Sequence, residues 1–266
     1  MSPLAAVVIA LIGLVVIFSA TWAWQLKTAN AGMVDPIWAY SLGLVAVLYA
    51  VLGTGDPLTR ALTALGGLVW GTRLGTHLWK RNFGKPEDAR YHRFREQWGD
   101  QAASKMFWFF QLQVVISMLL SIAFLVPSYR ATPPSTGWLV LAVVLWIASV
   151  AGEGLADRQL QRFKADPANH DTVCRVGLWR YSRHPNYFFE CVHWLAYLAL
   201  SIGTPLGWLT LASPLLMAWL LLKVSGLPLV EAQSEKTRPG YAEYRRTTSA
   251  LIPWPPQRES QRESRP

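Results

Sequence analysis

Residues Leu4–Trp24 read LAAVVIALIGLVVIFSATWAW, which is 21 consecutive positions without a charged side chain. A helix of about 20 residues is long enough to cross the hydrocarbon core of a bilayer. The rest of the chain has a similar composition: 52% of its 266 residues are hydrophobic and only 15% are charged, whereas roughly 25% are charged in soluble domains. The sequence therefore predicts an integral membrane protein.

Six further stretches of the chain are apolar enough to span a membrane. They are Ile37–Thr54, Ala61–Trp79, Phe107–Val126, Trp138–Ala156, Tyr187–Ile202 and Leu206–Leu222. Because backbone groups in lipid must be paired internally, we expect each stretch to form a continuous helix. The predicted fold is all-α and polytopic, with seven transmembrane helices in one domain, residues 1–256. The polar residues 257–266 are expected to form a disordered tail.

The positions of lysine and arginine predict the orientation. Seven basic residues lie in 80–105, six in 158–183 and eight after residue 222, whereas the connections 55–60 and 127–137 hold one each. With seven spans, all three basic regions lie on one side, which the positive-inside rule makes cytoplasmic. The N-terminus is then outside and the C-terminus cytoplasmic. This placement accounts for the net charge of +9, so membrane lipids rather than nucleic acid are the expected partners.

The third expected span carries polar side chains that are costly inside a membrane. Arg73 and His77 are four residues apart and share one helix face, which continues to Arg81. This stripe either belongs to a functional site or pairs with a carboxylate on another helix to hold the bundle. The nearest candidate carboxylate is Asp35, whose position before Pro36 also fits a simple helix cap.

The densest polar cluster lies between the fifth and sixth spans. Residues Gly177–Glu190 read GLWRYSRHPNYFFE, and the preceding helix presents Asp157 and Lys164 on one face. Arginine forks suit phosphate, and aromatic rings stack on flat bases. The helix that begins after His184 would also offer free N–H groups to an anion. These features favour a nucleotide site.

A lipid-headgroup anchor is the alternative interpretation of this cluster. It explains the arginines but not Asn186 and Glu190, which the sixth span carries into the membrane. The candidate nucleotide-binding residues are Arg81, Asp157, Lys164, Arg175, Arg180, Tyr181, Arg183, His184, Asn186, Tyr187 and Glu190.

Several familiar motifs are missing from the sequence. It contains no GxGxxG or GxxxxGK[ST] phosphate loop, no HExxH metal motif and no serine hydrolase elbow. Cys174 and Cys191 are 17 residues apart, with no paired spacing that would indicate a disulfide framework or a metal site. No metal is expected, and a bound nucleotide would lie among membrane helices and their connecting loops.

The cluster resembles the steroid 5-alpha-reductase family, and more closely its bacterial branch. The resemblance is carried by Gly177–Glu190, Ala156–Lys164 and the ending Leu-Ile-Pro-Trp254, and it extends over about Asn30 to Trp254. It implies a seven-helix membrane reductase that uses NADPH. It also implies that residues matching Asp157, Lys164, Asn186 and Glu190, with the basic and aromatic residues between them, hold the nucleotide on the cytoplasmic side.

The sequence departs from this family at the substrate. In the eukaryotic members a Gln-Glu pair on the second helix and a tyrosine on the third contact the 3-oxo group. Asp35 is the best match for that glutamate, and the third span contains no tyrosine, so Arg73 and His77 are the polar groups available there. Asp35, Arg73 and His77 are therefore the candidate catalytic residues.

The expected reaction is NADPH-dependent reduction of the Δ4 double bond of a 3-oxo-steroid, or of a related enone that enters from lipid. Two other functions stay open. One is an S-adenosylmethionine-dependent methyltransferase of the isoprenylcysteine carboxyl type, because those enzymes carry a similar Arg-His-Pro-x-Tyr string. The other is a non-enzymatic sterol or lipid binder. With 18 Arg against 7 Lys, a bacterial inner membrane is the expected location, or the endoplasmic reticulum in a eukaryote.

Overall fold

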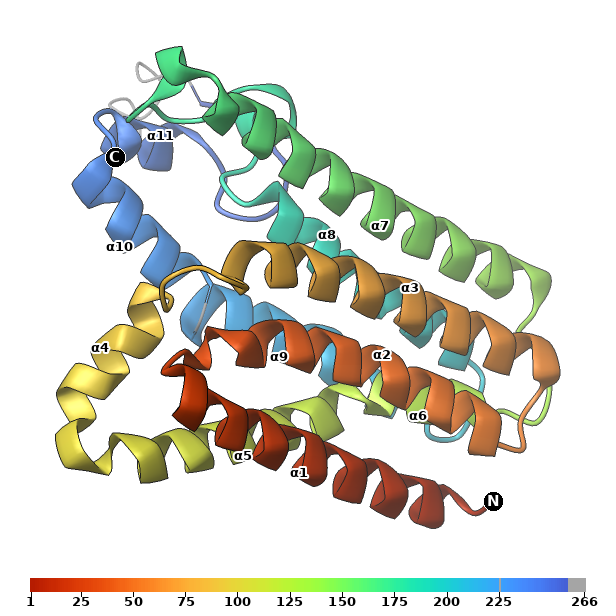
Figure 1. Ribbon diagram of the computed structural model, residues 1–266. Coiled ribbons are helices and arrows are strands. Elements are labelled where there is room, and N and C mark those ends of the chain that lie inside the picture. The colour runs from red at the N-terminus through yellow and green to blue at the C-terminus, as the bar shows by residue number, and fades with distance from the viewer. Residues whose placement is uncertain (225, 258–266) are drawn as a thin grey trace, which may run out of the picture. The chain divides into compact units, whose positions relative to one another are not determined.

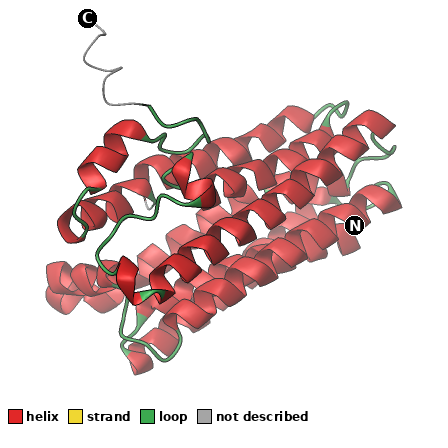
Figure 2. Ribbon diagram, turned by 90° about the horizontal axis from the view of Figure 1, so that it is seen from above, coloured by secondary structure: helices red, strands yellow, loops and turns green. Residues whose placement is uncertain are grey.

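The structure, a computed structural model, describes residues 1–224 and 226–257. Every regular element in these ranges is a helix (Figure 2). The chain forms two compact units, Met1–Trp138 with Leu200–Ser213 and Leu139–Ala199 with Pro214–Pro266. Apart from Gln257, the expected disordered tail lies outside the described residues.

The helices follow one another without a repeat (Figure 1). Those that begin in the first unit are α1 (Pro3–Thr28), η1 (Ala31–Met33), α2 (Val34–Leu52), α3 (Pro57–Asn82), α4 (Ala89–Trp98), η2 (Gly99–Gln101), α5 (Ala102–Leu120), α6 (Ile122–Ser128), α7 (Thr136–Ala165), η5 (Gly207–Leu211) and α9 (Ala212–Trp219). Those that begin in the second unit are η3 (Pro167–Asn169), η4 (Gly177–Arg180), α8 (Pro185–Ser201), the π-helical turn η6 (Leu220–Val224), α10 (Leu227–Thr237) and α11 (Tyr241–Thr247).

Five helical stretches of the described residues are long and apolar enough to cross a membrane. They are Pro3–Thr28, Ala31–Leu52, Ala89–Ser128, Thr136–Ala165 and Gly207–Thr237. This confirms the prediction of an all-α membrane protein with several spans. The two other expected spans are α3, which is 26 residues long but includes several basic side chains, and α8, which has only 17 residues. A total of seven spans and the orientation of the termini stay predictions.

Helices α2 and α3 of the first unit pack against each other through small residues. A Cβ atom added at Gly71 would lie 2.7 Å from the carbonyl oxygen of Ala39, and one added at Gly67 would overlap the Cβ of Ala46. Gly67, Gly71 and Gly75 recur every fourth residue on α3. Such a spacing of small residues lets two membrane helices approach closely without a hydrophobic driving force.

Arg130 closes one end of the first unit. Its Nε donates a hydrogen bond to the carbonyl of Thr132 at 2.5 Å, and its Nη1 donates to Ile202 at 2.5 Å and to Leu200 at 3.2 Å. The last carbonyls of a helix have no partner within that helix. The buried guanidinium therefore satisfies the carbonyl end of α8 and fixes the connection that follows α6.

The α2–α3 packing generates a stability prediction. Gly71→Ala should lower the free energy of unfolding by about 1–3 kcal/mol, because the new methyl group overpacks a tight interface. Thermal unfolding in detergent measures the effect.

Gly13→Ala in α1 is the matched control, since a Cβ at Gly13 meets no atom within 4 Å. Alanine favours a helix over glycine by up to about 1 kcal/mol, so this variant should melt at or above the wild-type temperature. Equal melting temperatures for Gly71→Ala and wild type would contradict the close packing.

Candidate functional site

A buried carboxylate on α10 organises the second unit. Oε1 of Glu231 accepts a hydrogen bond from Nε of Arg183 at 2.8 Å and lies 3.1 Å from Nε2 of His184. None of the three residues is more than 9% exposed. A buried charge is tolerated only when it is paired and hydrogen-bonded, so these three side chains depend on one another.

Arg183 also binds the end of α11. Its Nη1 donates to the carbonyl of Arg245 at 2.8 Å and to that of Thr248 at 2.5 Å. A cation at a helix C-terminus interacts favourably with the helix dipole and with the unpaired carbonyls. Arg183 was predicted to bind the nucleotide. In the structure its guanidinium binds α10 and the end of α11.

The C-terminal segment lies along the stretch Tyr181–Arg183. The backbone N–H of Arg183 donates to the carbonyl of Ser249 at 2.8 Å. The hydroxyl of Ser182 donates to Leu251 at 2.8 Å, and the N–H of Trp254 donates to Tyr181 at 2.9 Å. The Leu-Ile-Pro-Trp ending is therefore bound directly to the arginine- and tyrosine-rich stretch, although about 70 residues separate them in sequence.

Arg175 is held by α11. Its guanidinium makes two hydrogen bonds to the Glu243 carboxylate, at 3.0 and 3.1 Å, and donates a third to the carbonyl of Gly240 at 3.0 Å. The hydrogen bonds from Arg175 hold the pKa of Glu243 below its ordinary value. The guanidinium also lies over the ring of Tyr244, 5.5 Å from its centroid. Arg175 therefore has internal partners for its charge.

The start of α8 contains an acceptor without a partner. Nδ2 of Asn186 donates a weak hydrogen bond to Asp157 at 3.4 Å, and Oδ1 of Asn186 is buried without a hydrogen-bond partner in the described residues. The ring of His184 stacks on that of Tyr187 at a centroid distance of 5.2 Å. Leaving a buried acceptor unpaired is costly, so a ligand that donates a hydrogen bond fits this position.

Glu190 lies one turn further along α8. It is 5% exposed, and its Oε1 accepts a hydrogen bond from Nε1 of Trp194 at 3.1 Å. The structure therefore places Asn186, Glu190 and Asp157 as a polar group at the start of α8. Lys164, Arg180 and Tyr181 are exposed around it.

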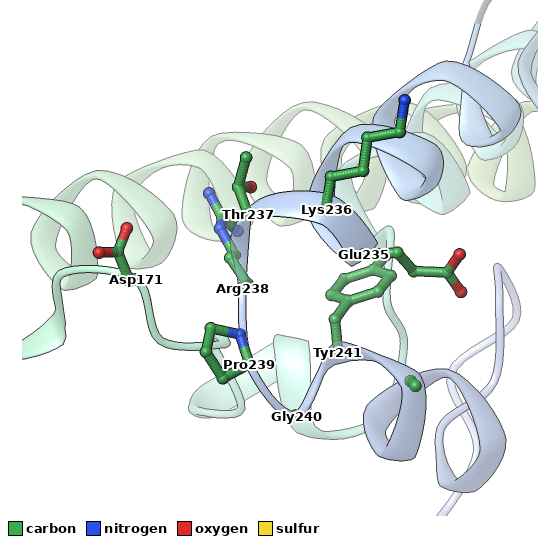
Figure 3. Close-up of a pocket in the computed structure, with 9 residues that line it drawn as sticks. Asp171, Glu235, Lys236, Thr237, Arg238, Pro239, Gly240 and Tyr241 are labelled. Atoms are coloured by element: carbon green, nitrogen blue, oxygen red, sulfur yellow. The ribbon is translucent and has the colours of Figure 1, made fainter.

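An open pocket of about 450 Å³ lies where α10 passes into α11 (Figure 3). Lys236 and Arg238 contribute cations, and the ring of Tyr241 points from α11 toward α10. Glu235, on the rim, is already paired with Arg245 at 2.6 Å. Burial and the nearby Glu231 carboxylate raise the pKa of Tyr241 to about 12, so its hydroxyl stays a donor at neutral pH.

Asp35 in the first unit is held by α4. Its Oδ1 accepts a hydrogen bond from the hydroxyl of Tyr91 at 2.6 Å, and its Oδ2 accepts one from Nη2 of Arg90 at 2.8 Å. The N-cap residue of α2 is Met33, and no side chain caps this helix end. The helix-cap alternative for Asp35 is therefore wrong.

The remaining candidates of the first unit lie on α3. Arg73 and His77 are half-buried one turn apart. Arg81 donates a hydrogen bond to Asp88 at 2.9 Å, and Arg90 donates to the other oxygen of Asp88 at 3.0 Å. Burial raises the pKa of Asp88, but the hydrogen bonds from Arg90 outweigh it and hold that pKa below the ordinary value. Arg81, predicted to bind the nucleotide, thus helps to anchor α4 to α3.

Residues 21–248 match the family model described as Protein of unknown function (DUF1295). The chain belongs to the DUF1295 family. Comparison with curated proteins finds no match, and comparison with solved structures finds none either. The match of this DUF1295 protein includes residues of both units. Among the residues described, no group of three or more His, Cys, Asp or Glu could hold a metal ion.

Two residues that contact the predicted site residues, Glu231 and Tyr91, were not predicted from the sequence. Glu231 is hydrogen-bonded to Arg183 and His184, which are 48 and 47 positions away in sequence. Tyr91 donates a hydrogen bond to Asp35, which is 56 positions away. Local spacing cannot reveal such pairs. The one available signal for Glu231 was an isolated acid in the otherwise apolar run Leu227–Ala232, since such an acid needs a partner.

The Glu231 cluster of this DUF1295 protein generates a prediction about stability. Glu231→Ala should lower the free energy of unfolding by about 3–5 kcal/mol, because it leaves the buried Arg183 cation without its carboxylate. It should also expose the segment after Ser249 to protease. Thermal unfolding and limited proteolysis measure the two effects.

Glu243→Ala removes an exposed ion pair with Arg175 and is the matched control. Exposed pairs contribute about 0–1 kcal/mol, so this variant should unfold close to wild type. If the two variants unfold alike, Glu231 does not hold the unit together.

Proposed function

We propose that this DUF1295 protein is an NADPH-dependent membrane reductase of the steroid 5-alpha-reductase type, acting on the Δ4 double bond of 3-oxo-steroids or related enones. The observation that carries the proposal is the polar group at the start of α8, with its buried and unpartnered Asn186 Oδ1. Support also comes from the resemblance of Gly177–Glu190 to that family and from the link of DUF1295 to steroid 5-alpha-reductase-like proteins.

The residues at the start of α8 fit the reactive end of a nicotinamide nucleotide. Asn186 offers an unpaired acceptor to an amide or hydroxyl donor, and Glu190 offers a second buried acceptor. The stacked rings of His184 and Tyr187 present an aromatic edge beside them. NADPH supplies a hydride when it is bound, and the protein has to orient it and keep water away.

Internal pairing narrows the arginines proposed for the 2′-phosphate. Arg175 and Arg183 are already bound to carboxylates. Arg180 is exposed and makes no ion pair within the described part of the chain, and Arg238 lines the open pocket. A phosphate recruits these side chains without breaking an internal pair, so Arg180 and Arg238 are the proposed readers of the 2′-phosphate.

Reduction of an enone also needs a group that stabilises charge on the carbonyl oxygen. Asp35 holds two hydrogen-bond donors, the hydroxyl of Tyr91 at 2.6 Å and Nη2 of Arg90 at 2.8 Å, and its proposed role is to position such a donor for that oxygen. Arg73 and His77 on α3 are the other candidates for this task. An apolar helical interior suits a flat hydrophobic substrate that arrives from lipid.

The proposal includes the topology expected from the sequence. Helices α3 and α8 would complete seven spans, with the N-terminus outside and the C-terminus in the cytoplasm. The proposed membrane is the bacterial inner membrane. A methyltransferase that uses S-adenosylmethionine and a non-enzymatic sterol binder are the competing functions, and the assay below separates them.

The proposed activity predicts a product two hydrogens heavier than its substrate. Membranes that contain the protein, incubated with NADPH and a Δ4-3-oxo-steroid, should yield this product by mass analysis, and NADH should work less well. Asn186→Ala should weaken NADPH binding about 5- to 150-fold, which corresponds to the loss of a contact of about 1–3 kcal/mol in a buried site.

Thermal shift with each cofactor separates the alternatives, because only a ligand of the native state raises the melting temperature. Stabilisation by S-adenosylmethionine and not by NADPH would favour the methyltransferase. Absence of stabilisation by both, together with binding of sterol, would favour the lipid binder.

The Asp35 assignment predicts a chemical defect. Asp35→Asn should slow single-turnover hydride transfer about 10²- to 10³-fold, because the donor that Asp35 holds toward the developing oxyanion loses its position, while NADPH still binds normally. Asp56→Asn is a matched carboxylate-to-amide control. Asp56 caps α3 through Thr59, and asparagine caps as well as aspartate. Wild-type transfer by Asp35→Asn would leave Arg73 and His77 as the candidates.

A further inference from the structure

Helix α8 carries a line of polar side chains beyond the residues assigned so far. Asn186, Glu190, His193 and Tyr197 follow one another at intervals of four, three and four residues, so they lie on one face of the helix. His193 is 0% exposed and Tyr197 is 1% exposed. Ionisable groups inside a membrane are expensive, and they mark proton relays and substrate paths more often than simple packing.

His193 and Tyr197 form a hydrogen-bonded pair. Nε2 of His193 lies 3.1 Å from the hydroxyl of Tyr197, and their rings meet edge to face at 5.1 Å. Trp194, between them in sequence, binds the Glu190 carboxylate. An imidazole and a phenol in contact can hold a proton and pass it from one to the other. The proposed function assigns no reaction step to His193 or Tyr197.

We infer that Tyr197, with His193 behind it, delivers the proton that the α-carbon of the enone takes up during reduction. The inference rests on the proposed reductase activity. When a hydride adds to the β-carbon, the electron pair of the double bond moves toward the carbonyl and an enolate forms. The α-carbon of the enolate then takes the Tyr197 proton, and the ketone re-forms. His193 returns a proton to the tyrosinate and is itself reprotonated from water, so one proton is consumed for each hydride.

The position of the pair along α8 agrees with this role. Tyr197 follows Glu190 by seven positions, which is about 10 Å along a helix at about 1.5 Å per residue. A substrate beside a nicotinamide held at Glu190 would extend over this distance. The carbonyl oxygen and the α-carbon of an enone are different atoms, so the α-carbon needs a proton donor of its own.

The test uses Tyr197→Phe and His193→Gln in membranes or detergent, with NADPH and a Δ4-3-oxo-steroid in ²H₂O. Wild type should place solvent deuterium on one face of the α-carbon. Tyr197→Phe should turn over at least tenfold more slowly and give both epimers, because water then supplies the proton from either side. His193→Gln should slow turnover and keep the single epimer. NMR of the product distinguishes the epimers.

A second measurement needs no cofactor turnover. Wild type should catalyse exchange of the α-hydrogen of the saturated ketone with ²H₂O, and Tyr197→Phe should lose this exchange. Tyr49→Phe is the matched control, because Tyr49 is also a fully buried tyrosine whose hydroxyl contacts another side chain, that of Ser121 at 3.3 Å. NADPH binding by each variant verifies that it is folded.

The outcomes separate the two proposals. A wild-type protein that does not reduce enones with NADPH contradicts the reductase and this inference together. An active wild type with unchanged rate, stereochemistry and exchange in Tyr197→Phe overturns this inference alone. A loss of rate shared by Tyr49→Phe and Tyr197→Phe, with a single epimer in both, means that Tyr197 is a structural residue.

Discussion

The carboxylate of Glu231 is the interaction on which the second unit depends. It accepts a hydrogen bond from Arg183 and is hydrogen-bonded to the ring of His184. Arg183 in turn donates a hydrogen bond to the carbonyl end of α11. The carboxylate therefore connects α10, α11 and the stretch that leads into α8. Removing water from a carboxylate is expensive, and here the hydrogen bond from Arg183 and the contact with His184 compensate that cost. The start of α8, where Asn186 and Glu190 lie, inherits its position from this cluster. The charges of Arg183 and Glu231 next to it are paired with each other.

The first unit follows the same rule with different residues. Glycines on α3 bring it against α2, where an added Cβ would meet the backbone or side chains of α2. Polar groups gather at the helix ends. There Asp35 accepts hydrogen bonds from Arg90 and Tyr91, and Asp88 accepts one from Arg90. A membrane protein cannot rely on a hydrophobic driving force between helices within lipid. Close packing of small residues and charged hydrogen bonds at the ends together take over that task, and both are visible in this unit.

The sequence predicts the helices well because their signal is local. Five of the expected spans lie within or overlap apolar helical stretches of the structure, whose ends differ from the expected ones by up to 18 residues, and the apolar period of a helix depends only on near neighbours. The polar start of α8 was also visible, since Asn186 and Glu190 follow His184-Pro185 within one turn or two. The partners of these residues were not predictable. Tyr91 joins Asp35 and Glu231 joins Arg183 across about 50 positions, and such contacts depend on packing that no single window of sequence contains.

The arginines show why counting charges in the sequence does not identify which cations are available to an anion. Arg175, Arg180 and Arg183 look equivalent in sequence, because all three lie within the ten positions before α8. In the structure Arg175 binds Glu243 and Arg183 binds Glu231, whereas Arg180 is exposed. A phosphate that competed for Arg183 would have to separate a buried ion pair, and the energy lost there would offset most of what the new contact contributes. Arg180 meets no such cost. The same reasoning applies wherever the basic loops of a membrane protein both set the topology and bind an anion. Cations that are already paired with internal carboxylates are not available to the ligand, and only the remaining cations can bind it.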